Sequence, residues 1–224
     1  LKTTLILIIF ELIKILSFNI NNALIGAEVI KRGGVIVYPT DTVYGIGGDP
    51  FREETVNRVI KLKGRRVKPF PILTSNINYV LRLANIRSKS ILELLNRIWP
   101  GSVTVILQSK RYLPEILGGK YVGLRIPNEP ILIKMIENIG GFLIGTSANI
   151  SGEPPAQNVN QAISYFADKV DLYLDGGDRK GKPSTVIKII NEKVKLIRIG
   201  ANIDKVLFHL KNLGFKIVGE EYEV

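Results

Sequence analysis

The chain has 224 residues, 46% of them hydrophobic, which predicts one compact domain with a sizeable core. Lys and Arg number 31 against 20 Asp and Glu, so the net charge is +11. A positive electrostatic field of this size attracts nucleotides, nucleic acid or anionic membrane surfaces; the alternative is that the excess of basic residues only reflects a generally basic proteome. No Cys is present, and His209 is the single His, which excludes disulfides, thiolate nucleophiles, Cys-ligated zinc, a His-based triad and a multi-His metal site.

The N-terminal segment contains an apolar run at residues 5–10. Charges at Lys2 and Glu11 leave no uninterrupted stretch near the roughly 20 residues that a membrane-spanning helix needs. No small-residue cleavage site follows the run, which argues against a signal peptide. We therefore expect residues 1–12 to be an appendage of unknown role, residues 13–224 to form a single domain, and the protein to be cytoplasmic, with no membrane partner.

Further along the chain, strand-like apolar runs alternate with amphipathic stretches, which is the pattern of an α/β domain. The first helix stops at Gly33-Gly34, and the helix that opens at the Ser88 cap ends before Trp99. In chain order the pattern predicts a helix at 23–31, a strand at 35–38, a helix at 53–62, a strand at 71–73, a helix at 88–98, strands at 103–107 and 121–126, a helix at 130–138, a strand at 142–144, a helix at 158–167 and a strand at 172–174.

The C-terminal part predicts a β-hairpin, with strands 186–190 and 194–199 joined across Asn191-Glu192. A helix at 204–212 and a strand at 215–218 follow. The hairpin and the uneven connection lengths favour a mixed sheet. The predicted fold class is therefore α/β, with a twisted mixed parallel and antiparallel sheet and flanking helices.

The strongest electrostatic feature is the strip at residues 61–68, KLKGRRVK, which holds five cations and no acid. It follows a predicted helix and contains Gly64, so we expect a helix exit and a loop. Several fixed cations, including the planar fork of Arg, suit the oxygens of a phosphate. A solvated surface run is the alternative for the strip taken alone.

Three other motifs lie at predicted strand ends, where open α/β sheets place ligands. Residues 38–48, YPTDTVYGIGG, and 145–152, GTSANISG, each follow a strand and offer hydroxyl, amide and glycine groups, although each alone also suits a structural turn. Residues 182–185, KPST, precede a strand. None of them is a Walker loop or a Rossmann fingerprint. Together with the strip they indicate a site for an anionic small molecule.

Two arginines end apolar strand-like runs, Arg125 in VGLRIP and Arg198 in KLIRIG. A charged group among apolar neighbours costs free energy unless it is paired. A ligand carboxylate or phosphate would pair each of them, and a structural salt bridge is the alternative.

The order of seven short motifs resembles the YrdC family over about residues 20 to 200. The motifs are PTDTVYG from Pro39, KGR from Lys63, WPGSVT from Trp99, GLRIP from Gly123, SANISG from Ser147, PSTV from Pro183 and IRIG from Ile197. The resemblance implies L-threonylcarbamoyladenylate synthase activity, a nucleotidyltransferase reaction that turns L-threonine, bicarbonate and ATP into threonylcarbamoyl-AMP and pyrophosphate. It also implies a large basic cavity and a separate complex that transfers the threonylcarbamoyl group to tRNA.

Carried over by position, the resemblance implies that Thr42, Arg125 and Ser184 hold threonine. It implies that a second set of residues holds ATP: Lys63, Arg65, Ser147, Asn149 and Arg198. Within this set, Lys63 and Arg65 would be the catalytic pair, which acts by charge stabilisation. Thr40, Thr74 and Thr104 are weaker candidates. Mg²⁺ is expected to accompany ATP without a dedicated protein cage, no tightly bound cofactor is expected, and no metal ligand is assigned.

The sequence departs from the family pattern in two places. Arg66 stands where the family usually has Pro, and Thr74 stands near a position where some members carry His, which leaves a role for Thr74 open. The chain also resembles the single-domain form, because longer members carry a linker and a second domain. Two other functions remain as alternatives: a non-catalytic protein that binds double-stranded RNA or tRNA, against which no base-stacking motif appears, and a carbamoyltransferase domain.

Overall fold

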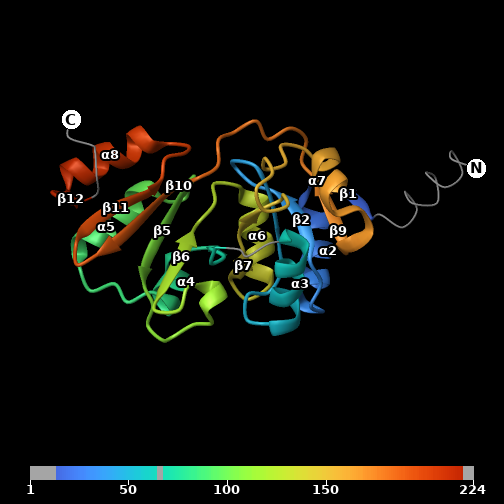
Figure 1. Cartoon of the computed structure of the whole chain (residues 1–224), viewed down its shortest axis with the longest axis horizontal. Helices are drawn as coiled ribbons and strands as arrows, with labels where there is room; N and C mark the ends of the chain where they lie inside the picture. The colour runs from blue at the N-terminus through green and yellow to red at the C-terminus, as the bar shows by residue number, and fades with distance from the viewer. Residues whose placement is uncertain (1–13, 65–67, 219–224) are drawn as a thin grey trace, which may run out of the picture.

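The computed structural model of the chain describes residues 14–64 and 68–218, and it places them in two mixed β-sheets surrounded by helices (Figure 1). The expected appendage at residues 1–12 lies outside the described residues, as do Arg65 and Arg66. The α/β class and the mixed pairing are confirmed. The difference from the prediction is that the strands divide into two sheets.

The first sheet has the strand order β1-β9-β2-β3-β8. Its strands are β1 (Ile15–Ser17), β2 (Ile36–Pro39), β3 (Tyr44–Gly47), β8 (Thr146–Ser147) and β9 (Leu172–Asp175). Strand β9 pairs in parallel with β1 and β2, whereas β3 is antiparallel to both β2 and β8.

The second sheet has the strand order β12-β11-β10-β5-β6-β4-β7. Its strands are β4 (Ile72–Thr74), β5 (Val103–Gln108), β6 (Tyr121–Arg125), β7 (Phe142–Ile144), β10 (Thr185–Ile190), β11 (Lys193–Arg198) and β12 (Lys216–Ile217). The predicted hairpin is confirmed: β10 and β11 pair antiparallel, and Asn191 and Glu192 both have positive φ, as a two-residue turn of type I′ requires.

Seven α-helices lie around the sheets in the described part of the chain. They are α2 (Ile20–Lys31), α3 (Glu53–Lys63), α4 (Ile77–Leu83), α5 (Lys89–Ile98), α6 (Pro130–Asn138), α7 (Val159–Phe166) and α8 (Ile203–Asn212), with short 3₁₀ turns η1 (Glu115–Leu117) and η2 (Ala167–Lys169). None of these helices is long and apolar enough to cross a membrane.

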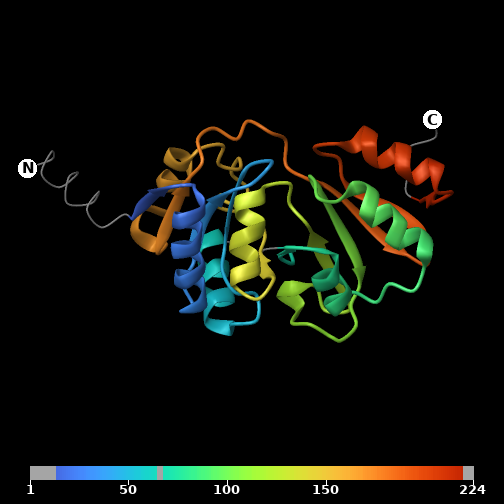
Figure 2. The same cartoon turned by 180° about the vertical axis from the view of Figure 1, so that it is seen from behind.

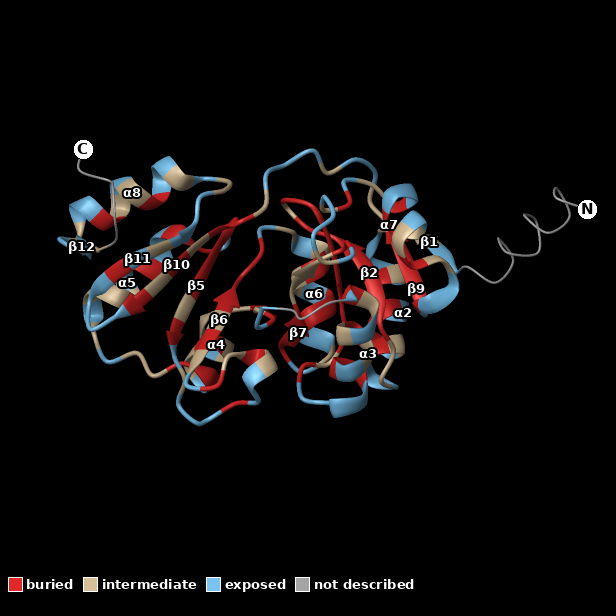
Figure 3. Ribbon diagram, in the orientation of Figure 1, coloured by how far each residue is buried: buried red, intermediate tan, exposed pale blue. Residues whose placement is uncertain are grey.

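Helices α2 and α6 lie side by side on one face of the molecule and cover strands of both sheets (Figure 2). Their apolar faces pack on a cluster that includes Ile36 and Leu172 of the first sheet and Leu73 and Leu143 of the second. A larger cluster fills the rest of the interior, and strands β2, β3, β4 and β7 are buried along their whole length (Figure 3). The two sheets therefore share one hydrophobic cluster beneath α2 and α6.

Strands β3 and β7 also join the two sheets through the backbone. The Ile144 amide donates to the Gly48 carbonyl at 3.0 Å, and the Tyr38 hydroxyl donates to the Ile144 carbonyl at 2.5 Å. A Cβ on Gly47 would lie 2.2 Å from the same carbonyl oxygen. Glycine is required at this position because two backbones come into contact there.

Most predicted elements are confirmed to within a few residues, and the differences have local causes. Residues 36–47 form a β2–β3 hairpin, so the loop expected after β2 was wrong for Tyr44–Gly47, whose glycines hid the strand pattern. Helix α2 starts three residues before the prediction, because the Asn19 side chain caps it by accepting from the Asn22 amide. The prediction missed α4, β1 and the two-residue β8, which are short.

Candidate functional site

A cavity of about 860 Å³ lies where the two sheets meet, and side chains from both sheets line it. Its size suits a ligand as large as a nucleotide. The polar and charged side chains of its lining are Thr40, Thr42, Lys63, Lys68, Thr104, Arg125, Thr146, Ser147, Asn149, Ser151, Ser184, Lys188 and Arg198. The tyrosines Tyr38, Tyr44 and Tyr121 and several prolines and aliphatic residues complete the wall.

Arg125, the last residue of β6, is the best-anchored cation of the cavity. Its Nε donates to the Gly101 carbonyl at 3.0 Å, its Nη1 to the Thr42 hydroxyl at 3.3 Å, and its Nη2 to Asp41 at 2.5 Å. The side chains of Arg125 and Asp41 are 7% and 11% exposed, so this is a buried ion pair. The guanidinium is therefore held by three different partners before any ligand arrives.

A second cluster joins three strands of the larger sheet around Ser184, which directly precedes β10. The Ser184 hydroxyl lies 3.0 Å from that of Thr104 on β5 and accepts from Arg198 Nη2 at 3.0 Å. Arg198 also donates from Nε to the Ser184 carbonyl at 2.9 Å. The pKa of Arg198 is lowered mainly by partial desolvation of its guanidinium and then by the nearby charge of Arg125, although the residue as a whole is exposed, and a bound anion would offset both effects.

A third cluster surrounds Lys63, the last residue of α3. Its Nζ donates to the Ser147 carbonyl at 2.6 Å and to Asn149 Oδ1 at 2.9 Å. The Ser147 hydroxyl also donates to Asn149 Oδ1, at 2.6 Å, while the Asn149 amide donates to the carbonyls of Ile150 and Glu153. Burial lowers the pKa of Lys63 to about 8. Its ammonium, with a third donor still to place, suits a phosphate oxygen.

The structure brings nearly all the predicted site residues together. Thr40, Thr42, Lys63, Thr104, Arg125, Ser147, Asn149, Ser184 and Arg198 all line the cavity. Arg65 belongs to the expected set but lies outside the described residues. Thr74 is the exception: it is fully buried and absent from the lining, because side chains alternate along β4 and Leu73 is the one that faces the cavity.

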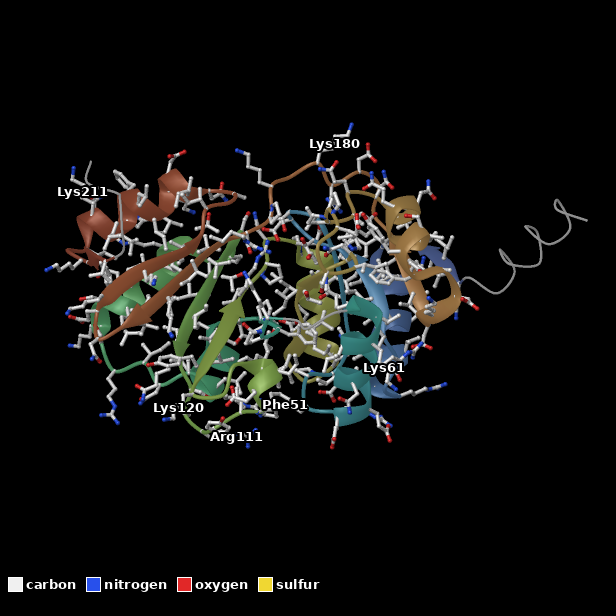
Figure 4. All side chains as sticks on the ribbon, in the orientation of Figure 1. Phe51, Lys61, Arg111, Lys120, Lys180 and Lys211 are labelled. Carbon is white, nitrogen blue, oxygen red and sulfur yellow. The ribbon has the colours of Figure 1, made fainter. Side chains whose placement is uncertain are left out.

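The structure also separates the cations of the basic strip. Lys63 is only 4% exposed and points into the cavity, whereas Lys61 is exposed on the outer side of α3 (Figure 4). Lys68 is exposed and lies at the edge of the cavity. The strip is therefore neither wholly a ligand site nor wholly a surface run.

Several polar residues around the cavity were not among the predicted site residues, and Asp41, Lys188 and Tyr121 are the most informative of them. Asp41 pairs with Arg125 although its carboxylate does not line the cavity, and Lys188 lies 3.9 Å from the ring centroid of Tyr121 on the wall. Only Asp41 had a signal, since it lies within a motif between two threonines. Lys188 and Tyr121 are brought together by the fold from distant parts of the chain, which no local pattern indicates.

The fold and the cavity define an α/β protein whose site is lined by cations and hydroxyls and suits an anionic small molecule. A profile of the Sua5, YciO and YrdC proteins, described as "Telomere recombination", matches residues 28–200. The chain belongs to this family.

Relatives of known name agree with this assignment. A "Threonylcarbamoyl-AMP synthase" of Nitrosococcus oceani is 36% identical over 172 residues, which cover 72% of this chain and 90% of that protein. A "Putative threonylcarbamoyl-AMP synthase" of Methanocaldococcus jannaschii is 34% identical over 196 residues, covering 85% and 93%. The crystal structure of Pyrococcus abyssi Sua5 complexed with L-threonine superposes with a TM-score of 0.79 at 28% identity; the match covers 94% of this chain but 64% of that one.

Proposed function

We propose that the protein is a threonylcarbamoyl-AMP synthase, which converts L-threonine, bicarbonate and ATP into threonylcarbamoyl-AMP and pyrophosphate. The observation that carries the proposal is one cavity that holds a carboxylate-binding arginine at one place and, at another, cations with no acidic partner among the described residues. A relative that matches 72% of the chain bears that name, and one that matches 85% bears it as a putative name; both support the proposal.

The threonine subsite is proposed around Arg125, Thr42 and Ser184. Arg125 has free donors for a bidentate contact with the amino-acid carboxylate, and the hydroxyls of Thr42 and Ser184 lie on the same wall. The L-threonine bound to Pyrococcus abyssi Sua5, a structural relative, supports an amino acid as one ligand. Thr40 and Thr104 would support this subsite, because they hydrogen-bond to Thr42 and Ser184.

The ATP subsite is proposed around Lys63, Arg65, Ser147, Asn149 and Arg198. Lys63 and Arg198 have no acidic partner in the described part of the chain, so phosphate oxygens would be their counter-charges. Mg²⁺ would accompany ATP on its phosphates, because this ion usually keeps several waters and binds through substrate phosphates.

The chemistry at this site would be mainly positioning and charge stabilisation. Threonine's amine first forms a bond to the carbon of bicarbonate, and a C–O bond of bicarbonate breaks to release water and leave a carbamate. A carbamate oxygen then forms a bond to the α-phosphorus, and the bond from that phosphorus to the leaving pyrophosphate breaks. Lys63 and Arg65 would balance the charge that builds on the phosphates. The product would pass to a separate threonylcarbamoyl transferase that modifies tRNA.

Pyrophosphate release tests the proposal directly. It should require threonine and bicarbonate together, and ATP turnover that ignores threonine would contradict it. Lys63→Ala should lower kcat/KM by at least about a hundredfold, because a charge-stabilising donor is lost. Lys61→Ala is the matched control from the same helix and should leave the rate unchanged. The RNA-binding alternative predicts steeply salt-dependent RNA binding with no ATP-dependent chemistry.

A further inference from the structure

The charges around the cavity are unevenly balanced. In the part of the chain that the structure describes, Arg125 has a carboxylate partner, while Lys63 and Arg198 make no ion pair. Yet all three cations line the same cavity, and Arg198 is close enough to Arg125 for the two charges to repel. The Arg125–Asp41 pair is therefore neutral as a unit, whereas Lys63 and Arg198 are uncompensated, although Arg198 also donates to Ser184 of the same proposed subsite as Arg125.

The carboxylate responsible, Asp41, is itself fixed by a short chain of hydrogen bonds. Its Oδ1 accepts from Arg125, and its Oδ2 accepts from the Ser102 hydroxyl at 3.2 Å. The Asn202 amide donates to the same hydroxyl at 3.3 Å. Asp41 lies behind Arg125 rather than on the cavity wall, so it would act on a ligand only through that arginine.

The hydrogen bonds of Arg125 show what Asp41 leaves available. A guanidinium has five N–H donors, and three of them are used by Gly101, Thr42 and Asp41. The two that remain, one on each terminal nitrogen, match the two oxygens of a carboxylate. Because Asp41 is paired with Arg125, the two side chains together offer two positioned N–H donors but no net charge. A phosphate chain carries several negative charges and gains more from Lys63 and Arg198, which are uncompensated.

We propose that Asp41 is a specificity-determining positioning residue: it fixes the fork of Arg125 and neutralises its charge, and so reserves this end of the cavity for an amino-acid carboxylate and leaves phosphates to Lys63 and Arg198. The proposal rests on the proposed function, because it assigns the two ends of the cavity to threonine and ATP. It adds a residue whose role is to keep the two anionic groups from exchanging places.

The test is L-threonine binding measured by calorimetry, with and without saturating inorganic pyrophosphate. For wild type, we expect pyrophosphate to change the threonine Kd by less than twofold. For Asp41→Asn, we expect the Kd to rise at least tenfold, because an amide oxygen holds the guanidinium less tightly than a carboxylate does. With pyrophosphate, which can now reach an Arg125 that is no longer neutralised, we expect the Kd to rise further. Asp178→Asn is the matched control: it removes an equal charge from an exposed loop and should behave as wild type.

The outcomes separate this proposal from the proposed function. A wild-type protein that does not bind threonine overturns both. If wild type binds it, a Kd for Asp41→Asn within threefold of wild type, or threonine binding still indifferent to pyrophosphate, overturns only the role of Asp41. Thermal melting checks that Asp41→Asn folds. If it does not, Ser102→Ala replaces it, because this variant removes the hydroxyl that holds Asp41. Ser102→Ala should raise the threonine Kd at least threefold and make it sensitive to pyrophosphate, and a variant that does neither would overturn the role of Asp41.

Discussion

At the scale of single residues, Lys63 has an unusual environment for a cation of the proposed ATP subsite. Its amine is buried and, among the described residues, donates to neutral oxygens, the Ser147 carbonyl and Asn149 Oδ1. These bonds satisfy two donors, but they do not replace the hydration that an ammonium loses on burial. The charged form of Lys63 is therefore destabilised in the empty cavity, and a bound phosphate would stabilise it again.

ATP affinity should accordingly fall as the pH rises through the pKa of Lys63. Burial lowers this pKa from 10.5 to about 8, so the empty enzyme loses the proton above that pH, while bound phosphates favour the ammonium. Above pH 8, ATP binding must then take up a proton, and its Kd should rise by up to about tenfold per pH unit. Calorimetry between pH 7 and 9.5 measures this change.

The control for the pH prediction is Lys63→Arg, whose guanidinium stays charged across the range. Its Kd for ATP, whatever its value at pH 7, should not follow the wild-type slope. A wild-type Kd that stays constant from pH 7 to 9.5 would contradict the assignment of the phosphates to Lys63.

At the scale of elements, the close approach of β3 to β7 decides how the two sheets meet. Gly45 and Gly47 of β3 both face groups that leave no space for a Cβ: the Tyr38 ring at 2.7 Å for Gly45 and the Ile144 carbonyl oxygen at 2.2 Å for Gly47. A ring can shift slightly, whereas a backbone carbonyl in a paired strand cannot. Gly47 is therefore the stricter requirement.

Gly47→Ala should lower the free energy of unfolding by at least about 2 kcal/mol, because the added methyl group forces β3 and β7 apart. Urea denaturation followed by circular dichroism measures the change. Gly123→Ala is the matched control on β6, since its Cβ would lie 3.4 Å or more from its neighbours, an ordinary contact distance. An equal loss in both variants would refute a specific effect of the β3–β7 contact.

At the scale of the whole molecule, the proposed ligands contact both sheets at once. Lys63 and Ser147 belong to elements at the first sheet, and Arg125, Ser184 and Arg198 belong to the second or adjoin it. A ligand that binds only the folded state stabilises it according to its concentration and Kd. Occupying the cavity should therefore stabilise the complete fold rather than one part of it.

Thermal melting should show this as separate shifts for each ligand. ATP or threonine at about a hundred times its Kd should add about 2.7 kcal/mol, and for a protein of this size that corresponds to a rise in Tm of roughly 5 °C or more. Arg125→Lys should lose the threonine shift and keep that of ATP, because the bidentate fork is gone while the phosphate cations remain. Loss of both shifts would contradict the division of the cavity.

The sequence by itself determined most of the elements and indicated the residues proposed for the site. Alternating apolar runs and capping residues are local features, so the helix at 130–138 and the strand at 142–144 were predicted with their final bounds. The seven ordered motifs indicated Lys63, Arg125 and the hydroxyl-bearing loops, because each motif is short and contiguous and needs no long-range contact to be recognised.

The tertiary structure alone decided which of these side chains meet, because that depends on pairings between residues far apart in the chain. Residues 44–47 form a strand since β2 and β8 pair with them on either side, although their own glycines favour a turn. Thr74 is excluded from the cavity by the register of β4, which turns its side chain away. The partnership of Asp41 with Arg125 spans 84 positions, and this buried ion pair arises only when the strands are brought together.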